Sequence, residues 1–61
     1  MISFKDYYGN EIYIHRADIV YIQKSWANDF GIIFVSHNDK ITISIETYDL
    51  IKRTLKEYYE N

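Results

Sequence analysis

The chain has no cysteine, no proline and only two glycines among its 61 residues. Without cysteine it can form neither a disulfide bond nor a cysteine-based zinc site, and two lone histidines are a poor substitute. Domains below about 70–80 residues usually depend on such cross-links, on a metal or on a partner, because one small core supplies little stability. Self-association is the ordinary route that remains. We therefore expect a homo-oligomer, a dimer or larger, that carries no cofactor and no metal.

Long apolar runs and clusters of basic residues are also missing. No segment approaches the ~20 apolar residues of a membrane helix, and the N-terminus, where Lys5 and Asp6 come early, lacks the apolar core of a signal peptide. We expect a soluble cytoplasmic protein without membrane contact. Seven basic and nine acidic residues give a net charge of −2. A nucleic-acid binder usually has a basic stripe, so the charge does not support a nucleic-acid partner.

Aromatic residues, by contrast, are abundant: seven tyrosines, three phenylalanines and one tryptophan. Tyrosine provides a large contact area at low entropic cost and is enriched at protein interfaces. Aromatic residues are also common on half-buried strand faces, where they serve packing alone. Both interpretations stay open from composition.

Alternation of apolar and polar residues predicts several short strands. Ile2 and Phe4 share one face of the first, and Ile12 and Ile14 share one face of the second. Gly9-Asn10 is a good turn pair between them, because both residues tolerate a positive φ. The expected strands are at about residues 2–6, 11–15, 19–23, 31–36 and 41–45, and the expected helix is at about 47–59.

Two of these strands carry an unusual pattern, with apolar residues at consecutive positions 19–22 and 32–35. Neighbouring strand residues point to opposite faces, so such a strand has no face meant for water. A single helix covers only one face of a small sheet. The other must curl on itself or meet a second copy. We predict an α+β fold: a curved antiparallel five-stranded meander, partly barrel-like, followed by one C-terminal helix, in a single domain over residues 1–61.

The helix has its own signals. Thr47 is the expected N-cap, whose hydroxyl accepts a hydrogen bond from the first turn. Apolar residues at helical spacing predict a buried stripe. Its expected members are Tyr48, Ile51, Leu55 and Tyr58, widened by Leu50 and Tyr59.

Candidate partner-binding residues centre on the loop before the fourth strand. Trp26 lies there between Lys24 and Phe30, and tryptophan is the commonest hot-spot residue at interfaces. We expect Trp26 and Phe30 to anchor a partner or the dimer contact; the alternative is that the indole caps the small core. Tyr13 and Tyr21 are further candidates, because each lies on a strand and offers an aromatic surface. No catalytic residue and no metal ligand is predicted.

The remaining polar residues have simpler interpretations. His15 and His37 have no companion for catalysis, and we expect both to face solvent. The carboxylates of Asp6, Asp18 and Asp29 follow no metal-binding spacing and are expected to be turn residues. We predict that the protein is not an enzyme.

Four segments follow one another in an order that a known family shares. They are Met1-Ile2 and residues 9–14, 18–22 and 41–47. In this order the chain resembles the small flagellar/swarming motility protein family (FlbD-like), with Arg16-Ala17 standing where that family has Asn-Pro. The resemblance implies a small strand-rich protein that closes with a helix, and it implies no particular mechanism. In architecture alone, the chain is also similar to the carbon storage regulator family of RNA-binding dimers.

These observations favour a small non-enzymatic interaction or regulatory module that binds a protein partner through aromatic side chains or an exposed sheet edge. A phage-type inhibitor of a host protein is a special case. The alternative is a single-stranded nucleic-acid-binding protein that stacks bases on Tyr13, Tyr21 or Trp26. A third hypothesis is an oligomer that binds a nucleotide between its subunits.

Overall fold

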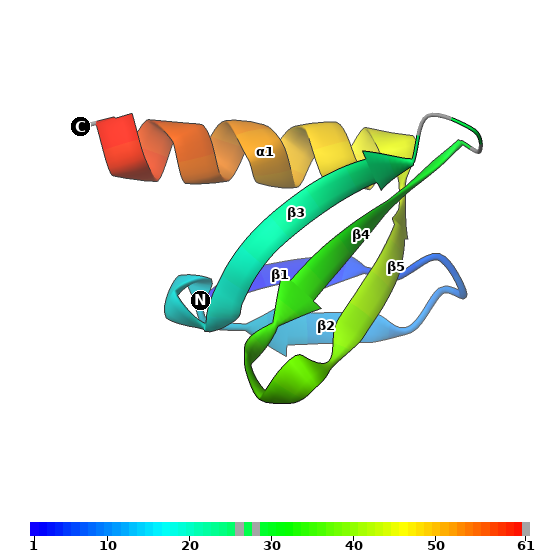
Figure 1. The fold of residues 1–61 in the computed structure, drawn as a ribbon, viewed down its shortest axis with the longest axis horizontal. Helices are drawn as coiled ribbons and strands as arrows, with labels where there is room; N and C mark the ends of the chain where they lie inside the picture. The colour runs from blue at the N-terminus through cyan, green and yellow to red at the C-terminus, as the bar shows by residue number, and fades with distance from the viewer. Residues whose placement is uncertain (26, 28, 61) are drawn as a thin grey trace.

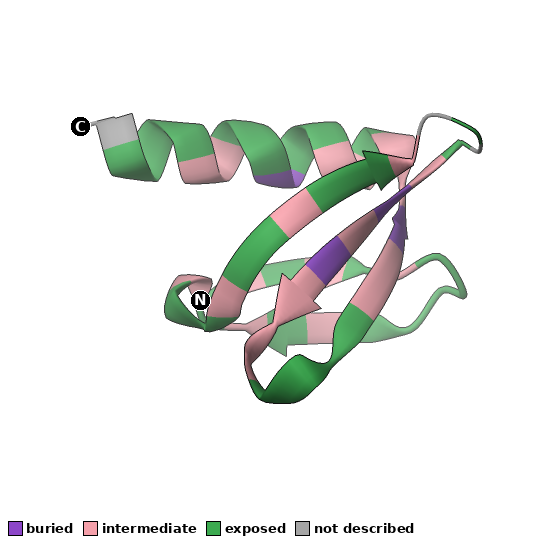
Figure 2. Ribbon diagram, viewed as in Figure 1, coloured by how far each residue is buried: buried purple, intermediate pink, exposed green. Residues whose placement is uncertain are grey.

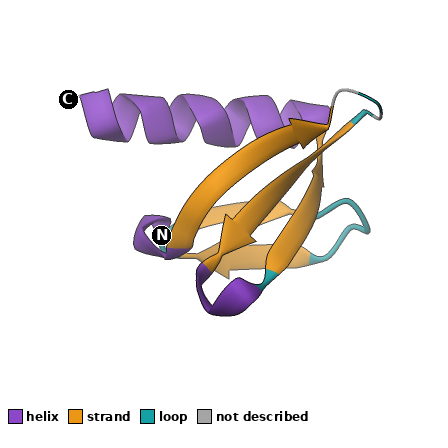
Figure 3. Ribbon diagram, viewed as in Figure 1, coloured by secondary structure: helices purple, strands orange, loops and turns teal. Residues whose placement is uncertain are grey.

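The computed structural model describes residues 1–25, 27 and 29–60, and five strands and one long helix lie within them (Figures 1 and 3). The strands are β1 (Ile2–Lys5), β2 (Glu11–Ile14), β3 (Ile19–Ser25), β4 (Phe30–Val35) and β5 (Lys40–Ser44), and the helix is α1 (Ile45–Glu60). The predicted α+β class, with antiparallel strands followed by a C-terminal helix, is confirmed.

The strands form two antiparallel sheets, one of β1 and β2 and the other in the order β3-β4-β5. A short 3-10 turn over Arg16–Asp18 separates β2 from β3, and within the described residues these two strands are not paired. The expected meander is therefore divided at this turn. Across the part of the chain that the structure describes, the sheets curve around one core but do not close into a barrel.

The core lies between the two sheets and α1. Ile33 of β4, Ile43 of β5 and Ile51 of α1 are 0%, 0% and 2% exposed, and Figure 2 shows these buried positions on the strands and on the face of α1 turned toward them. Apolar side chains from both sheets and the helix surround these three residues. They are Ile2, Phe4, Ile19, Ile22, Val35, Ile41, Tyr48 and Leu55. The alternation predicted for Ile2 and Phe4 thus points them inward, as expected.

The helix begins at Ile45, two residues before the predicted start, and its cap is Ser44 rather than Thr47. The backbone N–H of Thr47 donates to Ser44 Oγ at 3.2 Å, and Ser44 Oγ donates to Thr47 Oγ1 at 3.1 Å. Ser44 ends β5, so one residue closes the strand and opens the helix. The regular alternation through residue 45 concealed this, because Ile45 continues the strand pattern although it belongs to the helix.

The predicted buried stripe of the helix is correct at Tyr48, Ile51 and Leu55 and wrong at Leu50, Tyr58 and Tyr59. Ile51 is buried and Tyr48 and Leu55 are half-buried, but Leu50, Tyr58 and Tyr59 are 55%, 50% and 65% exposed. Figure 1 shows the reason for the two tyrosines: the last turns of α1 extend beyond the strands and have no sheet beneath them.

All five strands differ from their predicted ranges by one or two residues at one or both ends. β3 continues to Ser25, because the backbone of Ser25 still pairs with that of Phe30 although the side chains here are polar. β4 ends at Val35, and the turn to β5 follows. His37 and Asn38 have φ values of 70° and 65° there, in the left-handed region that such tight turns require. His15 and His37 are both exposed, as predicted.

Candidate functional site

The β3-β4-β5 sheet has one face against the core and one face that α1 does not cover. Along β4, Gly31 and Ile33 point to the core, so Ile32 and Phe34 point outward. Their neighbours across the β3–β4 ladder are Gln23 and Tyr21. The consecutive apolar residues of β4 therefore point alternately to the core and to the outward face, as predicted from their pattern.

Val20, Tyr21, Ile32 and Phe34 form an apolar surface on the outward side, which we call the outer patch. The Tyr21 and Phe34 rings are stacked, with centroids 4.3 Å apart and planes 18° apart. A register shift between Ile19 and Tyr21 leaves Val20 as an extra residue, a bulge that keeps both side chains outside the core. Val20 is 65% and Tyr21 is 53% exposed. The stacked aromatic pair and the exposed valine therefore leave a group of adjacent apolar side chains in contact with solvent.

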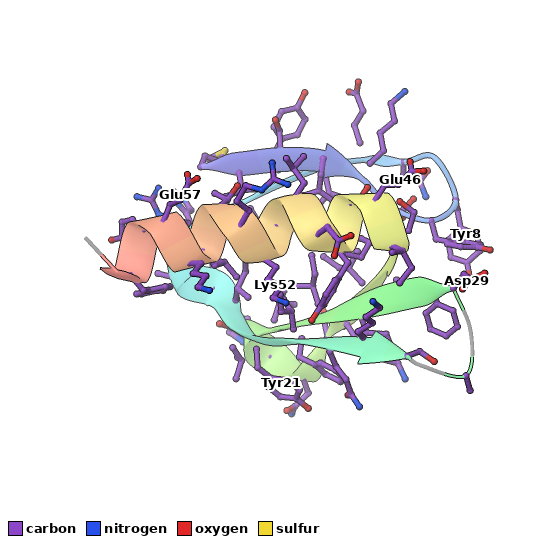
Figure 4. All side chains as sticks on the ribbon, turned by 90° about the horizontal axis from the view of Figure 1, so that it is seen from above. Tyr8, Tyr21, Asp29, Glu46, Lys52 and Glu57 are labelled. Atoms are coloured by element: carbon purple, nitrogen blue, oxygen red, sulfur yellow. The ribbon has the colours of Figure 1, made fainter. Side chains whose placement is uncertain are left out.

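A second group of aromatic side chains lies at the end of the molecule where β4 begins. Tyr7, Tyr8, Asp29 and Phe30, which we call the aromatic corner, line an open hollow of about 490 Å³ together with Thr42. The Tyr7 and Tyr8 rings are 5.7 Å apart at 76°, and the Tyr7 and Phe30 rings are 6.4 Å apart at 71°. Figure 4 shows Tyr8 and Asp29 beside each other at this end, with Tyr21 on a different side.

Hydrogen bonds hold the two tyrosines of the corner in place through their backbone. The N–H of Tyr7 donates to the carbonyl of Thr42 in β5 at 2.8 Å, which ties the β1–β2 turn to the other sheet. The N–H of Tyr8 donates to Asp6 Oδ1 at 2.9 Å, and that of Asn10 donates to the same oxygen at 2.8 Å.

Asp6 is therefore the centre of the turn. The side-chain amide of Asn10 donates to Asp6 Oδ2 at 3.1 Å, and this bond, with the backbone donors of Asn10, Tyr8 and Gly9, holds the pKa of the Asp6 carboxyl below its ordinary value. Desolvation opposes the shift but is outweighed by these hydrogen bonds. Gly9 has a φ of 88°, a conformation that a glycine adopts at no steric cost.

Four of the five residues predicted to bind a partner lie within the described residues, and these four are spread over different parts of the surface. Tyr21 belongs to the outer patch and Phe30 to the aromatic corner, whereas Tyr13 is 64% exposed on the outward side of β2, opposite Ser3. Lys24 is exposed on the same side of the sheet as Gly31, its partner in the ladder. Trp26 lies outside the described residues.

Sequence reasoning missed Tyr7, Tyr8, Val20 and Phe34 as surface residues. Tyr7 and Tyr8 stood next to the Gly9-Asn10 turn, and two adjacent aromatic side chains in a turn are a signal for exposure that the strand pattern obscured. No local signal shows that the turn meets Phe30, because the contact depends on how the two sheets are placed.

Two other places bring polar residues together. His15, Asp18, His37 and Asp39 line one hollow, but among the described residues no group of three or more histidine, cysteine or acidic side chains is arranged to hold a metal ion. At the helix end, the Arg16 guanidinium carbon lies 3.7 Å from the centre of the Tyr58 ring. This contact fixes η1, the Arg16–Asp18 turn, against α1.

No protein-family model, no curated protein and no solved structure matches this chain. Among the described residues, α1 and every shorter helical turn falls below the length and apolarity needed to cross a membrane.

Proposed function

We propose that the chain is a small non-enzymatic interaction module that works as a dimer and binds a protein partner. The observation that carries the proposal is the outer patch, where the stacked Tyr21 and Phe34 rings lie on a sheet face that the helix does not cover. The dimer places the outer patch of one copy on that of the other.

The small core supports a second copy as the occupant. Only three side chains in the described part of the chain, Ile33, Ile43 and Ile51, are fully buried. Each additional Å² of apolar surface removed from water contributes about 25 cal/mol, so pairing two outer patches adds stability that so short a chain cannot obtain internally. Self-association would thus stabilise the fold and remove the apolar outer patch from water.

The charge of the patch also supports self-pairing. An isologous interface pairs the same surface patch of two copies, so a patch that carries charge of one sign repels itself. The residues at the centre of the outward face, Tyr21, Gln23, Ile32, Phe34 and Thr42, are all uncharged. Lys40 also lies on this face, as the ladder partner of Phe34, and it lines the hollow beside the patch together with Asp39, which has the opposite charge.

Sedimentation velocity over a wide range of protein concentration tests the dimer. We expect twice the mass of the chain for the wild type. Tyr21→Glu should sediment as a folded monomer, because its side chain is already half exposed in one copy and pairing would bury the new charge against the apolar patch of the other. Tyr13→Glu is the matched control, since Tyr13 is an exposed strand tyrosine on the other sheet, and it should remain a dimer.

Three results would overturn this proposal. One is a monomeric wild type at every concentration, and another is an equal effect of the two tyrosine variants. The third is salt-sensitive retention of the monomer on single-stranded nucleic acid with loss in Tyr21→Glu, which would show that bases rather than a second copy stack on the patch.

A further inference from the structure

The aromatic corner lies at the end of the outward face where β4 begins, next to Thr42 and Ile32, and its chemistry differs from that of the outer patch. The outer patch is uncharged, whereas the corner combines three aromatic rings with a carboxylate, Asp29, the one acidic side chain that lines this hollow among the described residues. Tyr7 is 56% and Tyr8 is 77% exposed, so both rings remain available to a ligand.

The three rings pack edge to face at the hollow, with Tyr7 in contact with both of the others. Tyr7 is inclined at 76° to Tyr8 and at 71° to Phe30, so Tyr8 and Phe30 each stand nearly perpendicular to the Tyr7 ring. The face of an aromatic ring carries partial negative charge, and it attracts a cation within about 6 Å of its centre. A carboxylate at the same opening adds to this attraction. The chemistry of the hollow is therefore that of a site for an organic cation.

The aromatic corner is organised before any ligand arrives. Tyr7 is fixed to β5 by its bond to the Thr42 carbonyl, and Tyr8 is fixed by its bond to the Asp6 carboxylate. Phe30 is paired with Ser25 and Ser44 in the middle strand of its sheet. Because the backbone is already ordered, binding costs less conformational entropy than it would in a mobile loop.

We propose that the aromatic corner binds the guanidinium group of an arginine side chain on a partner protein. A planar guanidinium stacks on a ring face and donates two parallel hydrogen bonds to a carboxylate, which a compact ammonium group does less well. Elsewhere in the same chain, the Arg16 guanidinium carbon lies 3.7 Å from the centre of the Tyr58 ring. This inference goes beyond the dimer and does not depend on it.

The probe is a short capped peptide, acetyl-Gly-Arg-Gly-amide. Its binding is measured in an NMR titration through the ring-proton chemical shifts of Tyr7, Tyr8 and Phe30. The matched control ligand replaces arginine by citrulline, which has the same shape without the charge. We expect saturable shifts at the corner with the arginine peptide and binding at least several-fold weaker with the citrulline peptide.

Variants of the chain locate the site. Asp29→Asn and Tyr8→Leu should each weaken binding of the arginine peptide by about two- to fivefold, the change that a single exposed cation–π contact produces. Tyr13→Leu, which removes an exposed tyrosine elsewhere, should bind as the wild type does. Equal binding of the two peptides, or shifts confined to other residues, would refute the proposal. The titration repeated on Tyr21→Glu should give the same affinity, so failure of the dimer and failure of this site are seen separately.

Discussion

The ring of Tyr48 in α1 lies directly on the backbone of Gly31 in β4. A Cβ placed on Gly31 would be 2.7 Å from Tyr48 Cδ2, closer than Cβ atoms approach in folded proteins, and 3.0 Å from Tyr48 Cβ, which is tighter than most such contacts. Gly31 is fully buried and is paired with Ile43 of the core. This contact lets the first turns of the helix approach the middle strand, and it sets the distance between the two layers.

A methyl group at Gly31 should therefore push the helix away from the sheet. We expect Gly31→Ala to lower the free energy of unfolding by about 1–3 kcal/mol, the usual cost of overpacking a core. Urea unfolding at a fixed protein concentration measures this difference. A fixed concentration is required because association also contributes to the measured stability.

The double variant Gly31→Ala/Tyr48→Leu is the control for this mechanism. A leucine is shorter and more flexible than a tyrosine, so it should accommodate the added methyl group and recover part of the loss. If the double variant loses the sum of the two single effects, the contact between Gly31 and Tyr48 is not the cause.

The cap of α1 provides a second prediction. Ser44→Ala should cost about 0.5–2 kcal/mol of stability, because the Thr47 N–H then loses its acceptor. Thr47→Ala should cost less, since the Thr47 hydroxyl supports Ser44 but accepts no backbone bond of the first turn. Ser44→Thr keeps a capping hydroxyl and should remain close to the wild type. Thermal unfolding of the three variants is the measurement, and a larger loss in Thr47→Ala would argue for a later helix start.

The difference between the two cap assignments shows where sequence reasoning reached its limit. Ser44 and Thr47 are both favourable cap residues, and the choice between them depends on where the strand stops. Alternation through Ile41, Ile43 and Ile45 favoured a longer strand. The structure instead turns the chain at Ser44, because Phe30, its partner, is the first residue of β4 and the ladder has no further residue to pair.

The strands themselves were predictable, because their burial depends on local alternation. Ile2 and Phe4 point inward as their spacing predicts, and the apolar run at 32–35 does place Ile33 in the core and Phe34 outside it. The division into two sheets was not predictable, since it depends on the turn at Arg16–Asp18. The aromatic corner shares this limit: Tyr7 and Phe30 meet only because the turn after β1 is bound to β5.

A third prediction concerns the far end of the helix. The Arg16 guanidinium over the Tyr58 ring should contribute about 0.5–1 kcal/mol, the range of an exposed cation–π contact. Tyr58→Phe keeps an aromatic face and should be almost neutral, whereas Tyr58→Leu should lose this contribution. In an Arg16→Gln background the leucine variant should lose nothing more. Urea unfolding of the four proteins in this double-mutant cycle measures the coupling energy between Arg16 and Tyr58. A coupling energy of zero would mean that the contact adds no stability.

The fourth prediction follows from the lowered pKa of Asp6. Hydrogen bonds to its carboxylate stabilise the ionised form in the folded chain, so the Asp6 pKa is lower when folded than its ordinary value of 3.8. The folded state therefore binds fewer protons than the unfolded state in the interval between these two values. The stabilisation is fully present above the ordinary pKa and is lost as the pH falls through the folded pKa.

Replacing Asp6 by asparagine should remove this pH dependence, because an amide does not titrate and cannot supply the second carboxylate oxygen to Asn10. The difference in unfolding free energy between the wild type and Asp6→Asn should be constant near neutral pH and should shrink as the pH falls below about 4. Urea unfolding at a series of pH values measures the difference, and Asp49→Asn controls for the loss of one exposed negative charge. Because Asp6 also fixes Tyr8, Asp6→Asn should weaken binding of the arginine peptide at the aromatic corner. The mass of the protein in sedimentation should stay the same. A difference that stays constant down to the lowest pH would show that the carboxylate does not hold the turn.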